Sequence, residues 1–236
     1  IPRAVLNDLA RTRATVFPGM PLFYQAFCEM PVAPALPHLR LCISAGAPLP
    51  PQVALGFRTK FGQAIHSFYG ASECGGICYA RAAKEPRQGF VGAALRGVEL
   101  SPADQPGSAT QIEVRSAAVG DGHFPVSEPA KLGAGVFRPD DLVELTDAGV
   151  SLVGRLSDVI NVAGKKVNPA EVEAHLLTHG SVRQDIVVGS ASALRNEEVT
   201  ACVGTAEGTP ERAVLALCHD MLSGRRAPEL SFRGPR

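Results

Sequence analysis

The stretch Gly154-Arg155-Leu156-Ser157-Asp158-Val159-Ile160-Asn161-Val162-Ala163-Gly164-Lys165-Lys166-Val167-Asn168-Pro169-Ala170-Glu171-Val172-Glu173 joins two parts of this chain. The apolar residues up to Val162 predict a strand, and Gly164-Lys165-Lys166 predicts a turn. Asn168 followed by Pro169 predicts a helix start with Asn168 as its N-cap. The sequence before this stretch is long and rich in strand patterns, and a shorter piece of mixed helix and strand follows it. The stretch therefore marks a junction.

The overall composition limits the class of protein. The chain has 236 residues, 45% of them hydrophobic, with 24 glycines and 19 prolines, which fits one large or two ordinary domains with many turns. A net charge of +0 argues against a dominant nucleic-acid or membrane-surface partner. No apolar run is long enough to span a bilayer. Because the chain begins at Ile1 without an initiator Met or a signal-peptide pattern, we expect a fragment or a processed protein.

The six cysteines are scattered, and none forms a Cys-x-x-Cys pair. Cys74 and Cys78 are the closest pair, but no second pair completes a zinc site. We therefore expect small, reduced core residues in a cytoplasmic protein.

Residues 1–88 predict an α/β layer, because helical and strand patterns alternate along them. This alternation favours a parallel sheet, and ligands of such sheets bind beyond the carboxyl ends of the strands. Two glycine-containing turns lie at such ends, one after Ser44 and one after Tyr69. The expected helices are 5–10, 21–27 and 51–61, and the expected strands are 15–17, 39–44 and 65–69.

Residues 89–154 change in texture to short alternating runs, which predict a small antiparallel sheet or barrel. After Asp158 the pattern predicts strands at 184–190 and 199–205 and helices after Asn168 and over 210–222. The expected fold is α/β. It has a partial large domain (residues 1–154) with a parallel layer and a small β-barrel-like subdomain, a hinge at 155–158, and a small α+β domain at 159–236.

Four motifs in a fixed order resemble the adenylate-forming superfamily of acyl-CoA synthetases, adenylation domains and luciferase-like ligases. They are Ser44-Ala45-Gly46-Ala47-Pro48-Leu49, Tyr69-Gly70-Ala71-Ser72-Glu73, Asp140-Asp141-Leu142 and the stretch from Gly154 to Glu173. The resemblance implies an ATP-dependent acyl-CoA synthetase that uses Mg²⁺, a small carboxylic acid and CoA. Such an enzyme forms an acyl-adenylate and then transfers the acyl group to CoA.

The resemblance assigns roles that the chemistry of the side chains supports. Glu73 can hold the Mg²⁺ on ATP oxygens, and the Ser72 hydroxyl can donate to phosphate. Tyr69 offers a flat face for adenine, Asp141 can accept both ribose hydroxyls, and Arg155 can donate to the same sugar. The expected nucleotide-binding residues are Gly46, Ala47, Pro48, Tyr69, Gly70, Asp141 and Arg155.

The family also implies roles for residues of the junction and of the acyl site. Asp158 would be the hinge between two half-reactions, and Gly164 would lie beside the pantetheine channel. Lys165 and Lys166 would attract CoA phosphates, with a solvated turn as the alternative. Two further positions concern the acyl group: Gly76 would allow its close approach, and His66 would line its pocket or be a core histidine.

Two parts of the family pattern are missing. Nothing between Ile1 and Ser44 resembles the Ser/Thr/Gly-rich phosphate loop that ends in Lys, and we expect the chain to stop before the family's C-terminal lysine. Since both supply positioning and charge neutralisation, we expect little adenylating activity from this chain alone. Two substitutions also depart from the pattern: Ser72 replaces Thr, and Asp140 replaces Gly, which puts a like charge beside Asp141.

Two other functions remain open. One is an adenylation domain that loads a carrier protein. The other is a non-catalytic paralogue that binds nucleotide or acyl groups, or that pairs as a dimer or with a second chain supplying the phosphate loop. His175 and His179 have zinc-compatible helical spacing, but without a third ligand a surface role is expected.

Overall fold

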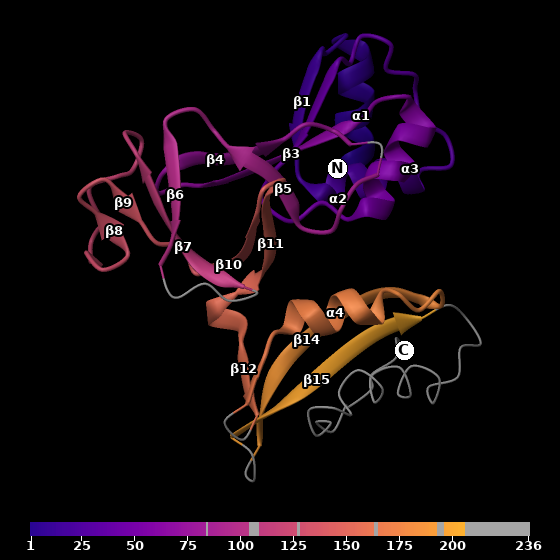
Figure 1. Ribbon diagram of the computed structural model, residues 1–236. Helices are drawn as coiled ribbons and strands as arrows, with labels where there is room; N and C mark the ends of the chain where they lie inside the picture. The colour runs from indigo at the N-terminus through magenta and orange to yellow at the C-terminus, as the bar shows by residue number, and fades with distance from the viewer. Residues whose placement is uncertain (84, 104–108, 127, 163–164, 193–195, 206–236) are drawn as a thin grey trace. The chain divides into compact units, whose positions relative to one another are not determined.

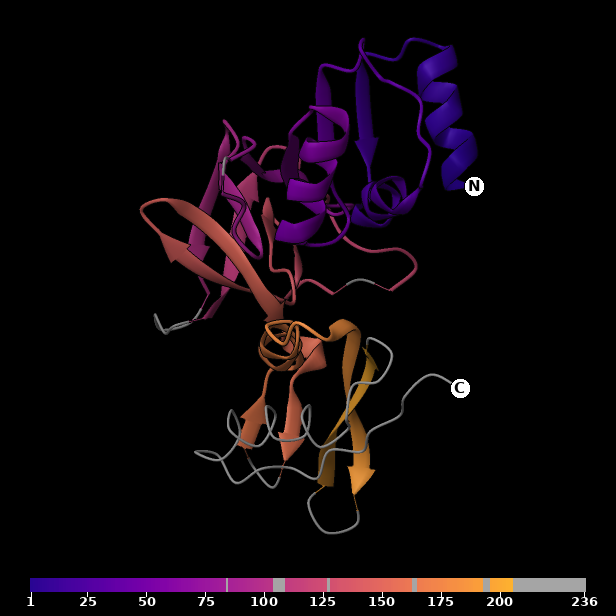
Figure 2. The same cartoon turned by 90° about the vertical axis from the view of Figure 1, so that its right-hand side faces the viewer.

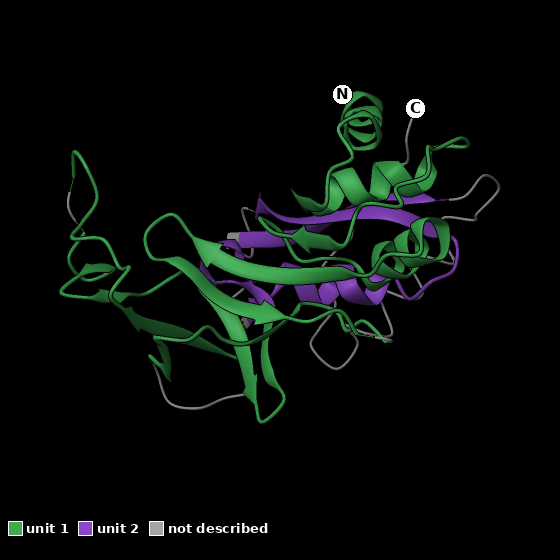
Figure 3. Cartoon of the chain, turned by 90° about the horizontal axis from the view of Figure 1, so that it is seen from above, with its two compact units in different colours: residues 1–152 green, residues 153–236 purple. Residues whose placement is uncertain are grey.

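The computed structural model describes residues 1–83, 85–103, 109–126, 128–162, 165–192 and 196–205. The chain divides into two compact units, residues 1–152 and 153–236, coloured separately in Figure 3. The helix expected over 210–222 lies outside the described residues. Within them, no helix has the length and apolarity needed to cross a membrane.

The first unit opens with the expected parallel layer. The strands β1 (Val16–Gly19), β2 (Leu41–Ser44) and β3 (Ile65–Ala71) pair in parallel. The helices α1 (Pro2–Arg11), α2 (Pro21–Glu29) and α3 (Pro51–Phe61) lie at the β1 end of the sheet (Figures 1 and 2). Each of these helices has a proline in its first turn, where the missing N–H is no loss.

Tyr24 ties α2 to the parallel strands. Its side chain is fully buried, and its ring stands edge-on to Phe57 with centroids 5.1 Å apart. Its hydroxyl lies 2.9 Å from the carbonyl oxygen of Phe17 and 3.0 Å from that of Ile43, so it can donate to either. A buried tyrosine needs such an acceptor, and α2 is thereby fixed against both strands.

Lys60 fixes the neighbouring pair of helices. From the last turn of α3, its ammonium group donates to the carbonyl oxygens of Phe27 (2.9 Å) and Cys28 (2.8 Å), and also to that of Met30. These carbonyls lie at the C-terminal end of α2, where the backbone acceptors have no partner within the helix and the helix dipole favours a cation. Lys60 thus caps α2 from another helix.

Beyond β3 the sheet turns antiparallel and continues to eleven strands. Of the antiparallel sheet or barrel expected for residues 89–154, the structure has the sheet and no closed barrel, because the described strands extend the same open sheet, with β1 and β8 at the two ends of its path. In order along this path come β4 (Gly75–Ala80), β5 (Phe90–Ala94), β11 (Gly149–Arg155), β10 (Asp141–Thr146), β7 (Thr110–Ser116), β9 (Val136–Phe137) and β8 (Leu132–Gly133), while β6 (Val98–Pro102) pairs with β7.

Two glycines make this continuity possible at β5. Gly92 has φ +84°, and a side chain there would meet the Tyr79 carbonyl oxygen of β4 at 2.2 Å. Gly149, at the start of β11, lies so close to β5 that a side chain would meet the Gly92 oxygen at 2.5 Å. The strands on both sides of β5 can approach because neither glycine carries a Cβ. The parallel layer and the antiparallel strands are therefore parts of one sheet.

The second unit is a small antiparallel sheet with one described helix. After the 3₁₀ turn η1 (Leu156–Asp158), the sheet order is β13-β12-β15-β14, with α4 (Pro169–Leu176) packed along it (Figure 1). The buried apolar cluster includes Ile160, Val172, Leu176 and Val199. The strand bounds are β12 (Ile160–Val162), β13 (Lys165–Val167), β14 (Val182–Ser192) and β15 (Asn196–Thr205).

Asn168 caps α4, as its sequence context predicts. Its side-chain oxygen accepts from the Ala170 N–H at 3.1 Å, and its amide donates to the Val153 carbonyl at 2.8 Å. A side chain at Gly154 would lie 2.5 Å from the Asn168 side-chain oxygen, so that glycine leaves room for the cap.

Asp185 is an unfavourably placed carboxyl group in this unit. Burial, followed by the nearby charge of Glu173, raises its pKa from 3.8 to about 6. Its Oδ2 atom is buried and has no hydrogen-bond partner in the described part of the chain. The folded protein therefore binds a proton at Asp185 more tightly than the unfolded chain does. The stabilisation of the folded state by this bound proton is complete below pH 3.8 and is lost as the pH rises to about 6.

Replacing Asp185 with Asn should stabilise the second unit at pH 7.5. The pKa difference corresponds to about 3 kcal/mol, which partial exposure reduces to about 1–2 kcal/mol. Hydrogen exchange of the β14 amides measures the stability of this unit. The difference in stability between variant and wild type should disappear at pH 4. A gap of equal size at both pH values would contradict the assignment.

Replacing Lys60 with Met should lower the free energy of unfolding of the first unit by about 1–2 kcal/mol, because three helix-terminal carbonyls lose a charged donor. Tyrosine fluorescence during urea unfolding reports on this unit alone, since all three tyrosines lie within residues 1–152. Arg96→Met, at an exposed turn position, is the control and should change stability by less than about 0.5 kcal/mol.

Candidate active site

The Tyr69–Glu73 motif forms a β-hairpin. The sequence places a loop directly after Tyr69, but β3 runs on to Ala71, so only residues 72–74 connect it to β4. Gly70 pairs with Gly76 across the hairpin, and a side chain at Gly70 would meet the Gly75 carbonyl oxygen at 2.5 Å. The strand continues because glycines on both sides let the two backbones approach.

Asp141 meets this hairpin through Tyr69. The Tyr69 hydroxyl donates to Asp141 Oδ2 at 2.8 Å, although the two residues are 72 positions apart in sequence. Tyr69 is only 7% exposed, and burial, followed by the Asp141 charge, raises the pKa of its hydroxyl. Tyr69 therefore stays a proton donor and holds the Asp141 carboxylate at the start of β10, while its ring packs in the core.

Asp140 does not leave an uncompensated charge beside Asp141. Its Oδ2 lies 2.9 Å from the ammonium group of Lys131, in a loop that the motif does not include. The negative charge of Asp140, which the sequence places beside Asp141, is thereby paired with a positive charge.

Glu73 lies in the hairpin turn with 31% of its side chain exposed. Its Oε1 is 3.6 Å from Nε2 of His123, and its backbone carbonyl accepts from the Gly120 N–H at 2.8 Å. No motif points to His123, which lies 50 positions after Glu73 in an irregular segment that contains glycines.

A magnesium ion carried by a nucleotide fits Glu73. The partly exposed carboxylate supplies the oxygen ligand that Mg²⁺ prefers, and Mg²⁺ usually takes one or two protein carboxylates together with substrate phosphates. No group of three candidate metal ligands exists among the described residues, so the other ligands would come from nucleotide and water.

The turn after β2 lies at the same edge of the sheet as this hairpin. β2 and β3 are parallel, with Ser44 paired to Ser67, so the segments that follow the two strands leave the sheet in the same direction. Gly46 has φ +87°, and Ala47 and Pro48 beside it are exposed. The first two motifs are therefore brought to one edge, as the parallel-sheet argument predicts.

His66 lies on β3 and Gly76 on the neighbouring β4. The Tyr79 hydroxyl lies 2.6 Å from Nδ1 of His66, and burial, followed by the Arg81 charge, lowers the pKa of this half-buried histidine. The α-carbon of Gly76 faces the ring of Phe68 and the side chain of Leu95. The roles of His66 and Gly76 at an acyl group stay predictions.

The second unit holds the remaining candidates. Arg155 ends β11 and is exposed, and Asp158 is exposed in η1, where its Oδ1 accepts from the Ser157 hydroxyl at 2.8 Å. Lys166 is exposed on β13. Gly164 lies outside the described residues, as does the side chain of Lys165, and the hinge role of Asp158 stays a prediction.

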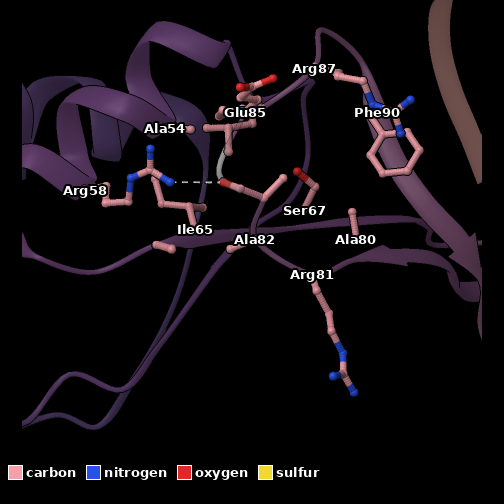
Figure 4. Close-up of a pocket in the computed structure, with 14 residues that line it drawn as sticks. Ala54, Arg58, Ile65, Ser67, Ala80, Arg81, Ala82, Glu85, Arg87 and Phe90 are labelled. Atoms are coloured by element: carbon pink, nitrogen blue, oxygen red, sulfur yellow. Dashed lines mark hydrogen bonds between the residues drawn. The ribbon is translucent and has the colours of Figure 1, made fainter. Parts of the chain in front are cut away.

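A separate pocket of about 80 Å³ lies between α3 and the segment after β4 (Figure 4). Within it the Arg58 guanidinium donates to the Ala83 carbonyl at 3.2 Å, and the Arg87 guanidinium lies 3.8 Å from the Phe90 ring centroid. Both cations are used to hold the segment in place. Leu49, at the end of the first motif, lines this pocket, but none of the candidate site residues does, and we assign it no ligand.

A family model described as "AMP-binding enzyme" matches residues 1–120. The chain belongs to this family. The resemblance to the adenylate-forming superfamily is thereby confirmed, and the matched residues include the first two of the four motifs.

Individual relatives agree with this assignment. Acyl-coenzyme A synthetase ACSM2, mitochondrial, from Rattus norvegicus is 28% identical over 219 residues, covering 86% of this chain and 38% of the relative. ATP-bound MatB from Rhodopseudomonas palustris superposes with a TM-score of 0.81 at 29% identity, over 99% of this chain and 49% of MatB. Amide bond synthetase McbA from Marinactinospora thermotolerans gives 0.84 at 27% identity, over 100% of this chain and 52% of McbA.

The chain thus spans about half the length of these solved structures and less than half of the curated relative. The relative named mitochondrial does not support the cytoplasmic location expected from the cysteines, and the compartment stays a prediction.

Replacing Tyr69 with Phe should weaken AMP binding about fivefold, because Asp141 loses a donor that fixes its orientation while the core keeps the ring. Isothermal titration calorimetry measures this. Tyr79→Phe removes a hydroxyl that contacts His66 instead and should leave AMP affinity within about twofold. Equal losses in the two variants would contradict the role given to the Tyr69 hydroxyl.

Proposed function

We propose that this chain is the portion of an ATP-dependent acid–thiol ligase that holds the nucleotide of an acyl-adenylate and delivers the acyl group to CoA. The observation that carries the proposal is the 2.8 Å hydrogen bond from the Tyr69 hydroxyl to Asp141. It joins two family motifs and orients a carboxylate that can accept from both hydroxyls of a ribose.

Candidate residues of the nucleotide site and the hinge have the following roles in this proposal. Asp141 and Arg155 bind the sugar, and the exposed turn at residues 46–48 contacts the base. Ser72 donates to the phosphate, and Glu73 binds the Mg²⁺ of the nucleotide, which neutralises phosphate charge when bound. Asp158 and the residues after it then change the relative position of the second unit between the half-reactions.

The acceptor of the acyl group is proposed to be CoA. The exposed Lys166 and its neighbour Lys165 can attract the CoA phosphates, and the relative ACSM2 is named as an acyl-coenzyme A synthetase. An amine is the second candidate acceptor, because McbA, named as an amide bond synthetase, is similar over the full chain. A carrier protein and a non-catalytic role are the further alternatives from the sequence.

The 236 residues are proposed to bind nucleotide but to form acyl-adenylate slowly on their own. No Ser/Thr/Gly-rich loop ending in Lys occurs before Ser44, so the phosphates lose part of the positioning and charge neutralisation on which catalysis depends.

Calorimetric titration of the chain with AMP tests the proposal. Asp141→Asn keeps an acceptor for Tyr69 but removes the charge, and it should weaken AMP binding at least about tenfold. Asp147→Asn, in the exposed turn between β10 and β11, removes a charge of the same kind close by and should leave the affinity within about twofold.

A second titration identifies the acceptor. With a non-hydrolysable acyl-adenylate analogue bound, CoA should bind more weakly to Lys166→Ala than to wild type. Absence of AMP binding by the wild-type chain, or equal binding by wild type and Asp141→Asn, would rule out the proposed nucleotide site. AMP binding without any binding of CoA would favour the amine or the carrier protein.

A further inference from the structure

His123 occupies a defined place beside the hairpin turn. The segment that leads to it begins at the end of β7, where the Ser116 hydroxyl accepts from the Ala118 N–H at 3.2 Å. The Gly120 N–H then donates to the Glu73 carbonyl at 2.8 Å, and the Ala118 methyl group packs 4.0 Å from the position of a Cβ on Gly75. This segment is therefore anchored on the turn that carries Glu73.

The imidazole of His123 presents one nitrogen to Glu73 and buries the other. Nε2 lies 3.6 Å from Glu73 Oε1, while Nδ1 is buried and has no hydrogen-bond partner among the described residues. A buried N–H without an acceptor is costly, so the favoured tautomer of the neutral ring carries its proton on Nε2. That proton then faces the Glu73 carboxylate.

No other side chain restrains this carboxylate in the described part of the chain. The ion pairs of the described residues give Glu73 no Lys or Arg partner, and its Oε2 accepts no hydrogen bond from them. The contact from His123 engages Oε1 and leaves Oε2 free for an oxygen-seeking cation. A carboxylate held through one oxygen loses less conformational freedom when the other binds a metal.

We propose that His123 is a positioning residue that orients Glu73 toward the divalent cation of a metal–nucleotide complex. The inference rests on the proposed nucleotide-binding function and adds a residue that lies outside the four family motifs. Both side chains are about one-third exposed, so their contact contributes little to stability, and its effect belongs to metal-dependent binding.

Calorimetry on the full 236-residue chain separates this role from a structural one. Wild type and variants are titrated with AMP in EDTA and with a non-hydrolysable ATP analogue with and without Mg²⁺. In His123→Ala the gain in affinity that Mg²⁺ gives should fall about three- to tenfold, while AMP affinity stays within about twofold. His123→Gln, whose amide can donate to Glu73, should recover most of the gain.

Two further variants complete the experiment. Glu73→Gln should lose the Mg²⁺-dependent gain in affinity. Adding His123→Ala to Glu73→Gln should then have no further effect. His38→Ala removes another histidine of the first unit, one that accepts from Arg13 at 3.0 Å, and should change neither affinity. With Mn²⁺ replacing Mg²⁺, the NMR signal of the His123 Cε1 proton should broaden in the wild type and sharpen in Glu73→Gln.

The outcomes are distinguishable. AMP binding by the wild type with an unchanged Mg²⁺-dependent gain in His123→Ala overturns the inference alone, as does an equal loss of AMP and metal–nucleotide affinity. AMP binding with no Mg²⁺ effect on the ATP analogue in the wild type also overturns it. Failure of the wild type to bind AMP overturns the proposed function and the inference together.

Discussion

The buried hydroxyl of Tyr69 needs an acceptor, and this requirement connects the two halves of the first unit. Asp141 meets it at 2.8 Å, which joins the end of the parallel layer to β10 in the antiparallel extension. The same contact determines where the Asp141 carboxylate lies. Core packing therefore helps to position the carboxylate that is proposed to bind the ribose.

This hydrogen bond depends in turn on the close approach of strands around β5. Gly92 and Gly149 lack the side chains that would separate β4, β5 and β11, and the sheet continues from the parallel layer to β10. A separate barrel would have placed Asp141 on another body from Tyr69. The absence of two Cβ atoms at this crossing thus decides whether two motifs can meet, and the site is a property of the continuous sheet.

Local rules predicted most elements of the chain. Apolar spacing predicted α1 over 5–10, Pro21 and Pro51 stand at the expected starts of α2 and α3, and Asn168 caps α4 as expected, because these signals are local. The parallel order of β1, β2 and β3 followed from the alternation of helix and strand. The extension of β3 through Ala71 was missed, because pairing with Gly75 and Gly76 outweighed the turn preference of its glycine.

The sequence by itself determined the family, through motif residues whose types and order are set by the chemistry of a nucleotide, and it determined the elements whose signals are local. Only the tertiary structure decided that Tyr69 supports Asp141, that Lys131 offsets the charge of Asp140, and that His123 faces Glu73. Each of these contacts joins residues distant in sequence on different strands or loops. Their pairing depends on sheet register and loop path, which no local pattern of residues specifies.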